Sequence, residues 1–122
     1  MTTYYTKDHE WIAVEGDTGT VGITDYAQGQ LGDITFVELP EVGAAVKQGD
    51  APCVVDSVKA ASDVYAPVAG EIVSVNTPVS ETPEQVNKDP YAAWFFRLKP
   101  TDPAAAGNLL DARAYEGAIG DA

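Results

Sequence analysis

Short runs of apolar and β-branched residues, separated by Gly, Pro and Asp, make up most of the chain. Runs of this length bounded by turn-forming residues are typical of β-strands. The pattern predicts seven strands, at Trp11–Val14, Thr20–Ile23, Ile34–Leu39, Cys53–Val58, Val64–Val68, Ile72–Val75 and Trp94–Leu98. So many short strands in a small chain predict a mainly β fold, a flattened antiparallel barrel or sandwich.

A tight hairpin and a C-terminal helix are predicted at the two ends of this pattern. Gly16 and Asp17 tolerate the backbone angles of a tight turn, so a hairpin is expected between the first two strands. The longest helix is predicted at Asn108–Ile119, closed by Gly120 and packed against the strands. Its apolar stripe consists of Leu109, Leu110, Ala112, Tyr115 and Ile119.

Two shorter helices interrupt the strands. Thr24 or Asp25 can cap one or two helical turns over Tyr26–Leu31, and Gly32 provides the stop. A further turn or two is expected to begin at Pro83, since proline is favoured at the first helical position.

Size and charge limit what the chain can do. Its 122 residues, 45% of them apolar, suffice for one core, so residues 1–122 are predicted to form a single domain. With 19 acidic and 7 basic residues the formal net charge is −12. Bringing this charge close to a polyanion or an anionic lipid surface costs free energy. We therefore expect no nucleic-acid partner and no membrane partner.

The chain start and the cysteine count predict the compartment. The first residues, Met1 to Asp8, lack the basic and apolar character of a secretory signal and the Arg-rich character of a transit peptide. Cys53 is the single cysteine, which excludes an internal disulfide and a structural site of several cysteine ligands. These features favour the cytoplasm.

Few residue types suited to catalysis are present. The chain has one His and lacks the short motifs of nucleotide binding, zinc proteolysis and serine hydrolysis. His9 is interpretable as a hydrogen-bonded structural residue or as a base. Cys53 enters a run of valines and is expected to be a small buried side chain. No nucleophile, base and orienting group can be assembled, so an enzyme is the least favoured class.

One segment between two predicted strands has a different character. Residues 57–62 contain no Gly or Pro and consist of small side chains around Lys59. A hairpin here would present Lys59 at its tip, with Asp56 three residues before it and Asp63 four after it. Lysines are nearly always exposed, so a solvated surface lysine is one interpretation. A protruding lysine presented for covalent modification is the other.

The same segment resembles a known signature. Asp56–Asp63, with the sequence DSVKAASD, is similar to the lipoylation signature E-S-V-K-A-x-S-[DE] of the glycine cleavage system H proteins. The resemblance extends from about Tyr5 to Leu110. It includes further motifs at His9–Trp11, Val21–Ala27, Leu31–Asp33 and Phe36–Pro40.

This resemblance implies a lipoyl-domain type of fold and a carrier with no turnover of its own. Lipoate would be joined as an amide to the amine of Lys59. The implied partners are glycine decarboxylase, aminomethyltransferase, dihydrolipoyl dehydrogenase and a lipoylating enzyme. The carrier would pass an aminomethyl group between the first two and electrons to the third.

The resemblance also implies that the loaded arm folds back into a cleft on the carrier. We predict that Glu10 and Asp63 hold the ammonium group there, because a partly dehydrated carboxylate makes a strong charge-assisted hydrogen bond. Asp8 is a weaker candidate, and the alternative for Glu10 is a solvated strand residue. Asp56 is expected to take part in recognition by the lipoylating enzyme.

Two positions depart from the family pattern. Asp56 stands where the family usually has Glu, which could slow lipoylation without preventing it. Asn87–Trp94 resembles the family's N-x-D-P-Y-G-x-G-W but is one residue shorter and lacks both glycines. The turn before the last strand must therefore be built differently.

Other interpretations stay open at this point. Lipoyl domains of 2-oxo acid dehydrogenases and biotin carriers usually carry D-K-A or M-K-M at the tip, whereas Val58 and Ala60 flank Lys59 here. An H-like protein that donates lipoate to other proteins is a further possibility. An unmodified acidic module that binds a basic partner is the alternative outside the carrier class.

Overall fold

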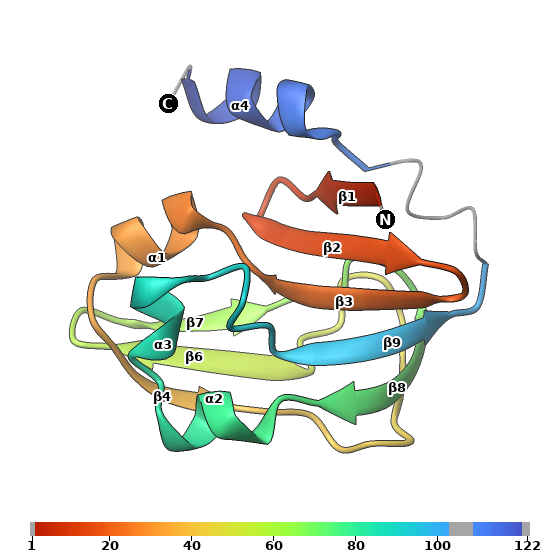
Figure 1. The fold of residues 1–122 in the computed structure, drawn as a ribbon, viewed down its shortest axis with the longest axis horizontal. Helices are drawn as coiled ribbons and strands as arrows, with labels where there is room; N and C mark the ends of the chain where they lie inside the picture. Colours follow the sequence, from red (N-terminus) through yellow and green to blue (C-terminus); the bar gives the residue numbers. More distant parts are fainter. Residues whose placement is uncertain (1, 103–108, 121–122) are drawn as a thin grey trace.

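The computed structural model describes residues 2–102 and 109–120, and within them the fold is mainly β (Figure 1). The strands are β1 (Thr2–Tyr5), β2 (Glu10–Glu15), β3 (Thr18–Ile23), β4 (Ile34–Glu38), β5 (Ala45–Val46), β6 (Cys53–Ser57), β7 (Ala61–Val64), β8 (Gly70–Val75) and β9 (Phe96–Pro100). The helices are α1 (Asp25–Leu31), α2 (Thr77–Glu81), α3 (Gln85–Lys88) and α4 (Ala112–Gly120).

The strands form two antiparallel sheets rather than a closed barrel. One sheet has the order β1-β2-β3-β9-β8-β5 and the other the order β4-β6-β7. Buried apolar side chains of both sheets form one core cluster, to which Ile12 and Leu98 contribute from the larger sheet and Val37 and Val55 from the smaller. The predicted mainly β, sandwich-like fold with antiparallel strands is confirmed.

The predicted hairpin between the first two predicted strands is present as β2 and β3. Glu15 pairs with Thr18, so Gly16 and Asp17 form a two-residue turn, and Gly16 takes the left-handed conformation with φ of 61°. Further along the hairpin Trp11 pairs with Gly22. The indole of Trp11 lies over Gly22 and donates a hydrogen bond of 2.9 Å to the carbonyl oxygen of Ile23.

The short helices follow their local signals in part. Helix α1 has Thr24 as its cap, whose Oγ1 accepts from the amide of Ala27, and it ends at Gly32 with φ of 77°. Helix α3 follows Pro83 as expected. Helix α2 was not predicted, and it begins after Asn76 with a proline in its first turn. No helix within 2–102 and 109–120 is long and apolar enough to cross a membrane.

Strand boundaries differ from the prediction where buried apolar residues belong to loops. The predicted strand Val64–Val68 is wrong, because β7 ends at Val64. The loop that follows is buried all the same: Ala66 and Val68 are each 1% exposed, and Pro67 has no amide to donate to a ladder. Strands β1 and β5 were not predicted, and the last strand begins at Phe96 rather than Trp94.

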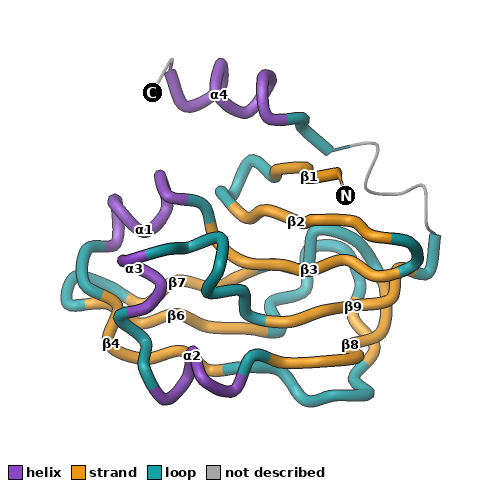
Figure 2. Tube along the Cα trace, in the orientation of Figure 1, coloured by secondary structure: helices purple, strands orange, loops and turns teal. Residues whose placement is uncertain are grey.

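The C-terminal helix begins later than Asn108, which lies outside the described residues. Leu110 pairs with Tyr5 in an antiparallel bridge, so its backbone extends the sheet instead of entering a helix. Asp111 then caps α4, because its Oδ1 accepts from the amide of Ala114 at 2.8 Å. Helix α4 lies alongside β1, as expected for a helix packed on the strands (Figure 2).

Gly22 gives the first prediction. A Cβ added there would lie 2.9 Å from two ring carbons of Trp11, in a strand pair with no room to move. We expect Gly22→Ala to lower the free energy of unfolding by about 1 to 3 kcal/mol, measured by urea denaturation. Gly29→Ala is the matched control, because a Cβ at Gly29 meets nothing within 4 Å. Equal stability of the two variants would contradict this account of the hairpin.

Candidate functional site

Lys59 lies at the tip of the hairpin formed by β6 and β7, and it is exposed. The last pair of the ladder joins Asp56 to Ala61. Ser57 holds the turn closed: its amide donates to the carbonyl of Ala60 at 2.8 Å, and its hydroxyl oxygen accepts from the amides of Lys59 and Ala60 at 3.2 Å each. The small residues around Lys59 therefore form a defined turn, as the sequence predicted.

The tip does not stand alone but rests on the connection between α1 and β4. The amide of Val58 donates to the carbonyl of Asp33 at 3.1 Å. A Cβ on Gly32 would lie 3.5 Å from Cε of Lys59, so the lysine stem passes over this glycine. The contacts with Asp33 and Gly32 thus support the direction in which the Lys59 side chain leaves the hairpin.

Asn87 fixes this connection from α3, which the sequence analysis did not predict. Its Oδ1 accepts from the amide of Ile34 at 2.8 Å. Its Nδ2 donates to the carbonyl of Gly32 at 2.8 Å and to Oε1 of Gln28 at 2.9 Å. In the sequence, Asn87 stands at the start of the N-K-D-P-Y stretch, for which no functional role was predicted.

Glu10 is buried at the start of β2, with 1% of its surface exposed. Its Oε1 accepts from the hydroxyl of Thr6 at 2.6 Å and its Oε2 from the amide of Tyr65 at 3.3 Å. Burial is the main cause that raises the pKa of this carboxyl to about 7, and the nearby charge of Asp8 adds to the rise. The hydrogen bonds from Thr6 and Tyr65 act in the opposite direction and lower the pKa. The alternative of a solvated strand residue is wrong.

His9 turns the chain so that Glu10 faces inward. It is the one non-glycine residue with positive φ among those described, at 67°, a conformation that His adopts more readily than most residues. The amide of His9 donates to the carbonyl of Thr6 at 3.2 Å, and the amide of Glu10 donates to the hydroxyl of Thr6 at 3.1 Å. Nδ1 of His9 contacts the hydroxyl of Tyr115 at 2.8 Å, which supports the structural interpretation of this histidine.

Three of the predicted carboxylate residues line one cleft of about 140 Å³. Asp8 comes from the turn before β2, Glu10 from the start of β2, and Asp63 from β7. Gln30 and Leu31 of α1 line the same cleft. Asp8 and Asp63 are exposed, so Glu10 is the dehydrated member of the group. Because Leu31 immediately precedes Gly32, the cleft adjoins the residue over which the Lys59 stem passes.

Asp56 lies apart from this cleft. It faces outward on β6, half-buried, in register with Phe36 on one side and Ala61 on the other. The structure therefore separates the fourth predicted acid from the other three.

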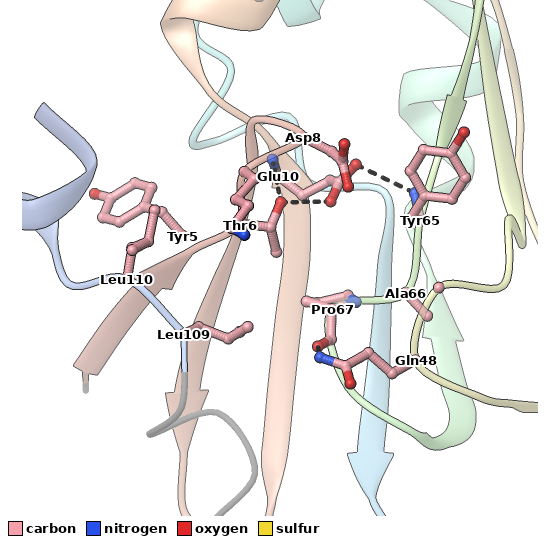
Figure 3. Close-up of a pocket in the computed structure, with 12 residues that line it drawn as sticks. Tyr5, Thr6, Asp8, Glu10, Gln48, Tyr65, Ala66, Pro67, Leu109 and Leu110 are labelled. Atoms are coloured by element: carbon pink, nitrogen blue, oxygen red, sulfur yellow. Dashed lines mark hydrogen bonds between the residues drawn. The ribbon is translucent and has the colours of Figure 1, made fainter. Parts of the chain in front are cut away.

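A second cavity, of about 260 Å³, also reaches Asp8 and Glu10 (Figure 3). The close-up shows Glu10 with its bonds to Thr6 and Tyr65, and Gln48, whose Nε2 donates to the carbonyl of Pro67 at 3.1 Å. Leu109 lines the side toward the C-terminal segment. The carboxylate of Glu10 thus belongs to the walls of two hollows.

Cys53 is 1% exposed, as expected of a small apolar side chain. Burial raises the pKa of its thiol, so the thiolate needed for nucleophilic attack or disulfide exchange is suppressed. Among the described residues, no three His, Cys, Asp or Glu side chains gather as metal ligands would.

Comparison with known proteins places this geometry in a family. The family model of the glycine cleavage H-protein matches residues 3–122. The chain is 61% identical over 114 residues to the glycine cleavage system H protein of Thermus thermophilus, covering 93% of this chain and 89% of the relative. The corresponding protein of Bradyrhizobium diazoefficiens is 56% identical over 116 residues, covering 94% and 95%. A crystal structure of the H protein from Mycobacterium marinum superposes with a TM-score of 0.88 at 44% identity, covering 98% of this chain and 97% of that one.

The chain belongs to the glycine cleavage H-protein family. H proteins carry lipoate, and they are the non-catalytic lipoyl carriers of the glycine cleavage system, whose other components are their partners. The resemblance stated from the motifs is therefore confirmed at the level of family, carrier function and fold.

The turn that departs from the H-protein pattern is built by Asp89. Its Oδ1 accepts from the amides of Tyr91 and Ala92 at 3.2 Å each, and its carbonyl accepts from the amide of Ala93 at 2.9 Å. No residue of this turn has positive φ, so it needs no glycine. The carbonyl of Pro90 also accepts from the indole of Trp11 at 3.3 Å, which ties the turn to β2.

Burial of Glu10 gives a prediction about pH. The folded protein holds this proton more tightly than the unfolded chain, so stability falls as the pH rises from about 4.5 to about 7. Glu10→Gln keeps the acceptor oxygen and cannot ionise. We expect its free energy of unfolding, relative to the unchanged protein, to rise by on the order of 3 kcal/mol across this window and to stay level above it. Denaturation at several pH values measures the difference, and a difference independent of pH would contradict the assignment.

Proposed function

We propose that lipoate is carried as an amide on Lys59 and that Glu10 and Asp63, with Asp8, hold the ammonium group of the cargo. The observation that supports this best is the arrangement of an exposed lysine on a closed hairpin turn whose stem passes the edge of a cleft lined by three acids. In this reading the chain takes an aminomethyl group from glycine decarboxylase to aminomethyltransferase.

The residues present suit such a group. Lys59 is exposed, and acylation would remove its charge, so neither Asp56 nor Asp63 is needed as a permanent ion-pair partner. A lysine stem with a lipoyl chain spans on the order of 10 to 15 Å when extended. A lipoyl group on Lys59 would supply a dithiolane able to take up the aminomethyl group of glycine, release the one-carbon unit and ammonia to aminomethyltransferase and tetrahydrofolate, and be reoxidised by dihydrolipoyl dehydrogenase.

The hairpin sets the direction in which the Lys59 side chain leaves the protein, and the tether raises the local concentration of the cargo. Ser57 and the contact of Val58 with Asp33 fix the base from which the stem leaves. A short tether can raise the local concentration of cargo to roughly millimolar in a partner's site. Asp56, outside the cleft and close to the tip, is available to the lipoylating enzyme. The cytoplasm remains the expected compartment.

Glu10 is suited to a cationic cargo because burial makes its ionised form unfavourable when no cation is nearby. A carboxyl with a pKa of about 7 is partly protonated at neutral pH. An ammonium group that enters the cleft favours the ionised form, so the proton leaves and the two charges pair. A charge-assisted hydrogen bond of this kind is worth about 1.5 to 3 kcal/mol. Pairing keeps water from the carbon that links sulfur and nitrogen in the cargo.

Intact mass and glycine–CO₂ exchange test the role of Lys59. With lipoate and the lipoylating enzyme present, the unchanged protein should gain one lipoyl group and support the exchange with glycine decarboxylase. Lys59→Arg keeps the positive charge but cannot form the amide, so we expect no mass gain and no exchange. Lys47→Arg, at another exposed lysine, is the matched control and should behave like the unchanged protein. A lipoyl group found on any lysine other than Lys59 would refute the assignment.

Loss of cargo to water tests the role of Glu10. Lipoylated protein is loaded with glycine on the decarboxylase, separated, and followed by release of ammonia and formaldehyde without aminomethyltransferase. We expect Glu10→Gln to speed this release about ten-fold at pH 8 and less at pH 6, where Glu10 is more often protonated. Asp63→Asn should have a smaller effect because Asp63 is exposed. Asp56→Asn, which removes an acid outside the cleft, is the control, and if it matched Glu10→Gln the cleft would have no special role.

A further inference from the structure

Tyr115 connects the C-terminal helix α4 to both sides of the acidic cleft. It is 5% exposed, and its hydroxyl lies 2.8 Å from Nδ1 of His9 and 2.7 Å from Oγ1 of Thr24. These partners are 106 and 91 residues away in the chain. One phenol oxygen therefore joins three segments that are remote in sequence.

The two partners of this hydroxyl belong to two different elements whose residues form walls of the cleft. His9 lies between Asp8 and Glu10, and all three line the cleft, from the turn before β2 and the first residue of that strand. Thr24 caps α1, whose Ala27, Gln30 and Leu31 line the other wall. Tyr115 itself is not a lining residue, so its hydroxyl acts on the cleft only through the elements that it holds.

The position of this hydroxyl is fixed independently of the cleft. The ring of Tyr115 stacks on Tyr5 with centroids 4.8 Å apart and planes inclined by 11°. Just before α4, Leu110 exchanges two backbone hydrogen bonds with Tyr5, of 2.7 and 2.9 Å, and Asp111 caps the helix. Helix α4 is thus anchored on β1, and the hydroxyl is held at a set place relative to the larger sheet.

The two partners of the Tyr115 hydroxyl make further hydrogen bonds that involve the backbone of both walls. Oγ1 of Thr24 also accepts from the amide of Ala27 at 3.2 Å, in the first turn of α1. The amide of Thr24 donates to the carbonyl of His9 at 3.0 Å, so the walls also meet directly. The His9 ring packs against Tyr26 of α1 at 4.6 Å between centroids. Removing the hydroxyl of Tyr115 would leave this backbone bond and this ring packing in place, and would remove the contacts that the hydroxyl makes with His9 and Thr24.

We propose that Tyr115 is a positioning residue that sets the separation of the two cleft walls and so limits the access of water to the aminomethyl cargo. This inference rests on the proposed function, because it assumes that the cargo lies beside Glu10. It assigns to the C-terminal helix a part in protecting the cargo, separate from acylation of Lys59 and from the chemistry on the partner enzymes.

Tyr115→Phe tests the inference, since it removes the hydroxyl and keeps the ring that stacks on Tyr5. We expect release of ammonia and formaldehyde from the loaded, lipoylated variant to be about two- to ten-fold faster than from the unchanged protein, well below its unfolding temperature. Tyr5→Phe is the matched control, because it removes a hydroxyl from the other ring of the stack and should leave the rate unchanged. Rates of lipoylation and of dihydrolipoyl reoxidation, which use the extended arm, should be the same in all three proteins.

A double-mutant cycle with Glu10→Gln separates this inference from the proposed function. If Tyr115 acts by holding the wall that carries Glu10, the double variant should release cargo little faster than Glu10→Gln alone. Additive effects would overturn the claim that Tyr115 works through the cleft. Acceleration by Glu10→Gln but not by Tyr115→Phe would refute the inference and leave the proposed function intact. Acceleration by neither would refute the proposed function.

His9→Asn provides a second variant should Tyr115→Phe fold poorly. Asn adopts the left-handed conformation of position 9 but lacks the ring that reaches Tyr115. It should accelerate release of the cargo in the same range as Tyr115→Phe. An unchanged rate in a folded His9→Asn protein would contradict the proposal by the same reasoning.

Discussion

The cost of burying the carboxylate of Glu10 is the constraint around which the site is arranged. A nearly fully buried acid needs partners for both oxygens, and Thr6 and the amide of Tyr65 provide them. To bring those partners together, the chain makes a tight turn before β2, uses a left-handed His9, and buries the loop after β7 instead of continuing the strand. Even so, the pKa stays high, because two hydrogen bonds do not replace the water that burial removed.

Under the proposed function, a cationic cargo would lower the free-energy cost of ionising this carboxyl, and the carboxyl would lower the cost of taking the cargo out of water. Without a cation, Glu10 can take up a proton and remain neutral at little cost. With a cation beside it, the ionised form gains a partner, and the ammonium loses less by leaving water. The exposed acids Asp8 and Asp63 do not have this property, because solvent screens them whether or not the cargo is present. Asp56, near the lysine tip, does not line the cleft and so is not placed to do what Glu10 is proposed to do.

The sequence predicted what local chemistry determines. Gly16 and Asp17 marked the first hairpin, Thr24 and Gly32 bounded α1, and the small residues around Lys59 indicated a closed turn. It missed what depends on distant partners. The backbone of Leu110 binds Tyr5, so the predicted helix from Asn108 could not begin where its apolar periodicity allowed. Buried loop residues such as Ala66 and Val68 looked like strand because apolar composition reports burial rather than a ladder.

This difference between prediction and structure corresponds to how the lysine turn and the cleft are each built. The turn at Lys59 is closed by hydrogen bonds within one hairpin, so a motif of eight consecutive residues could reveal it. The cleft is assembled from the turn before β2, from α1, from β7 and, through Tyr115, from the last helix. Contacts between remote segments, such as those of Asn87 with the α1–β4 connection and of Tyr115 with His9, hold these elements, and no short pattern contains them. Under the proposed function, acylation of the lysine would therefore depend on one segment, whereas shelter for the cargo would depend on contacts between segments from the whole fold.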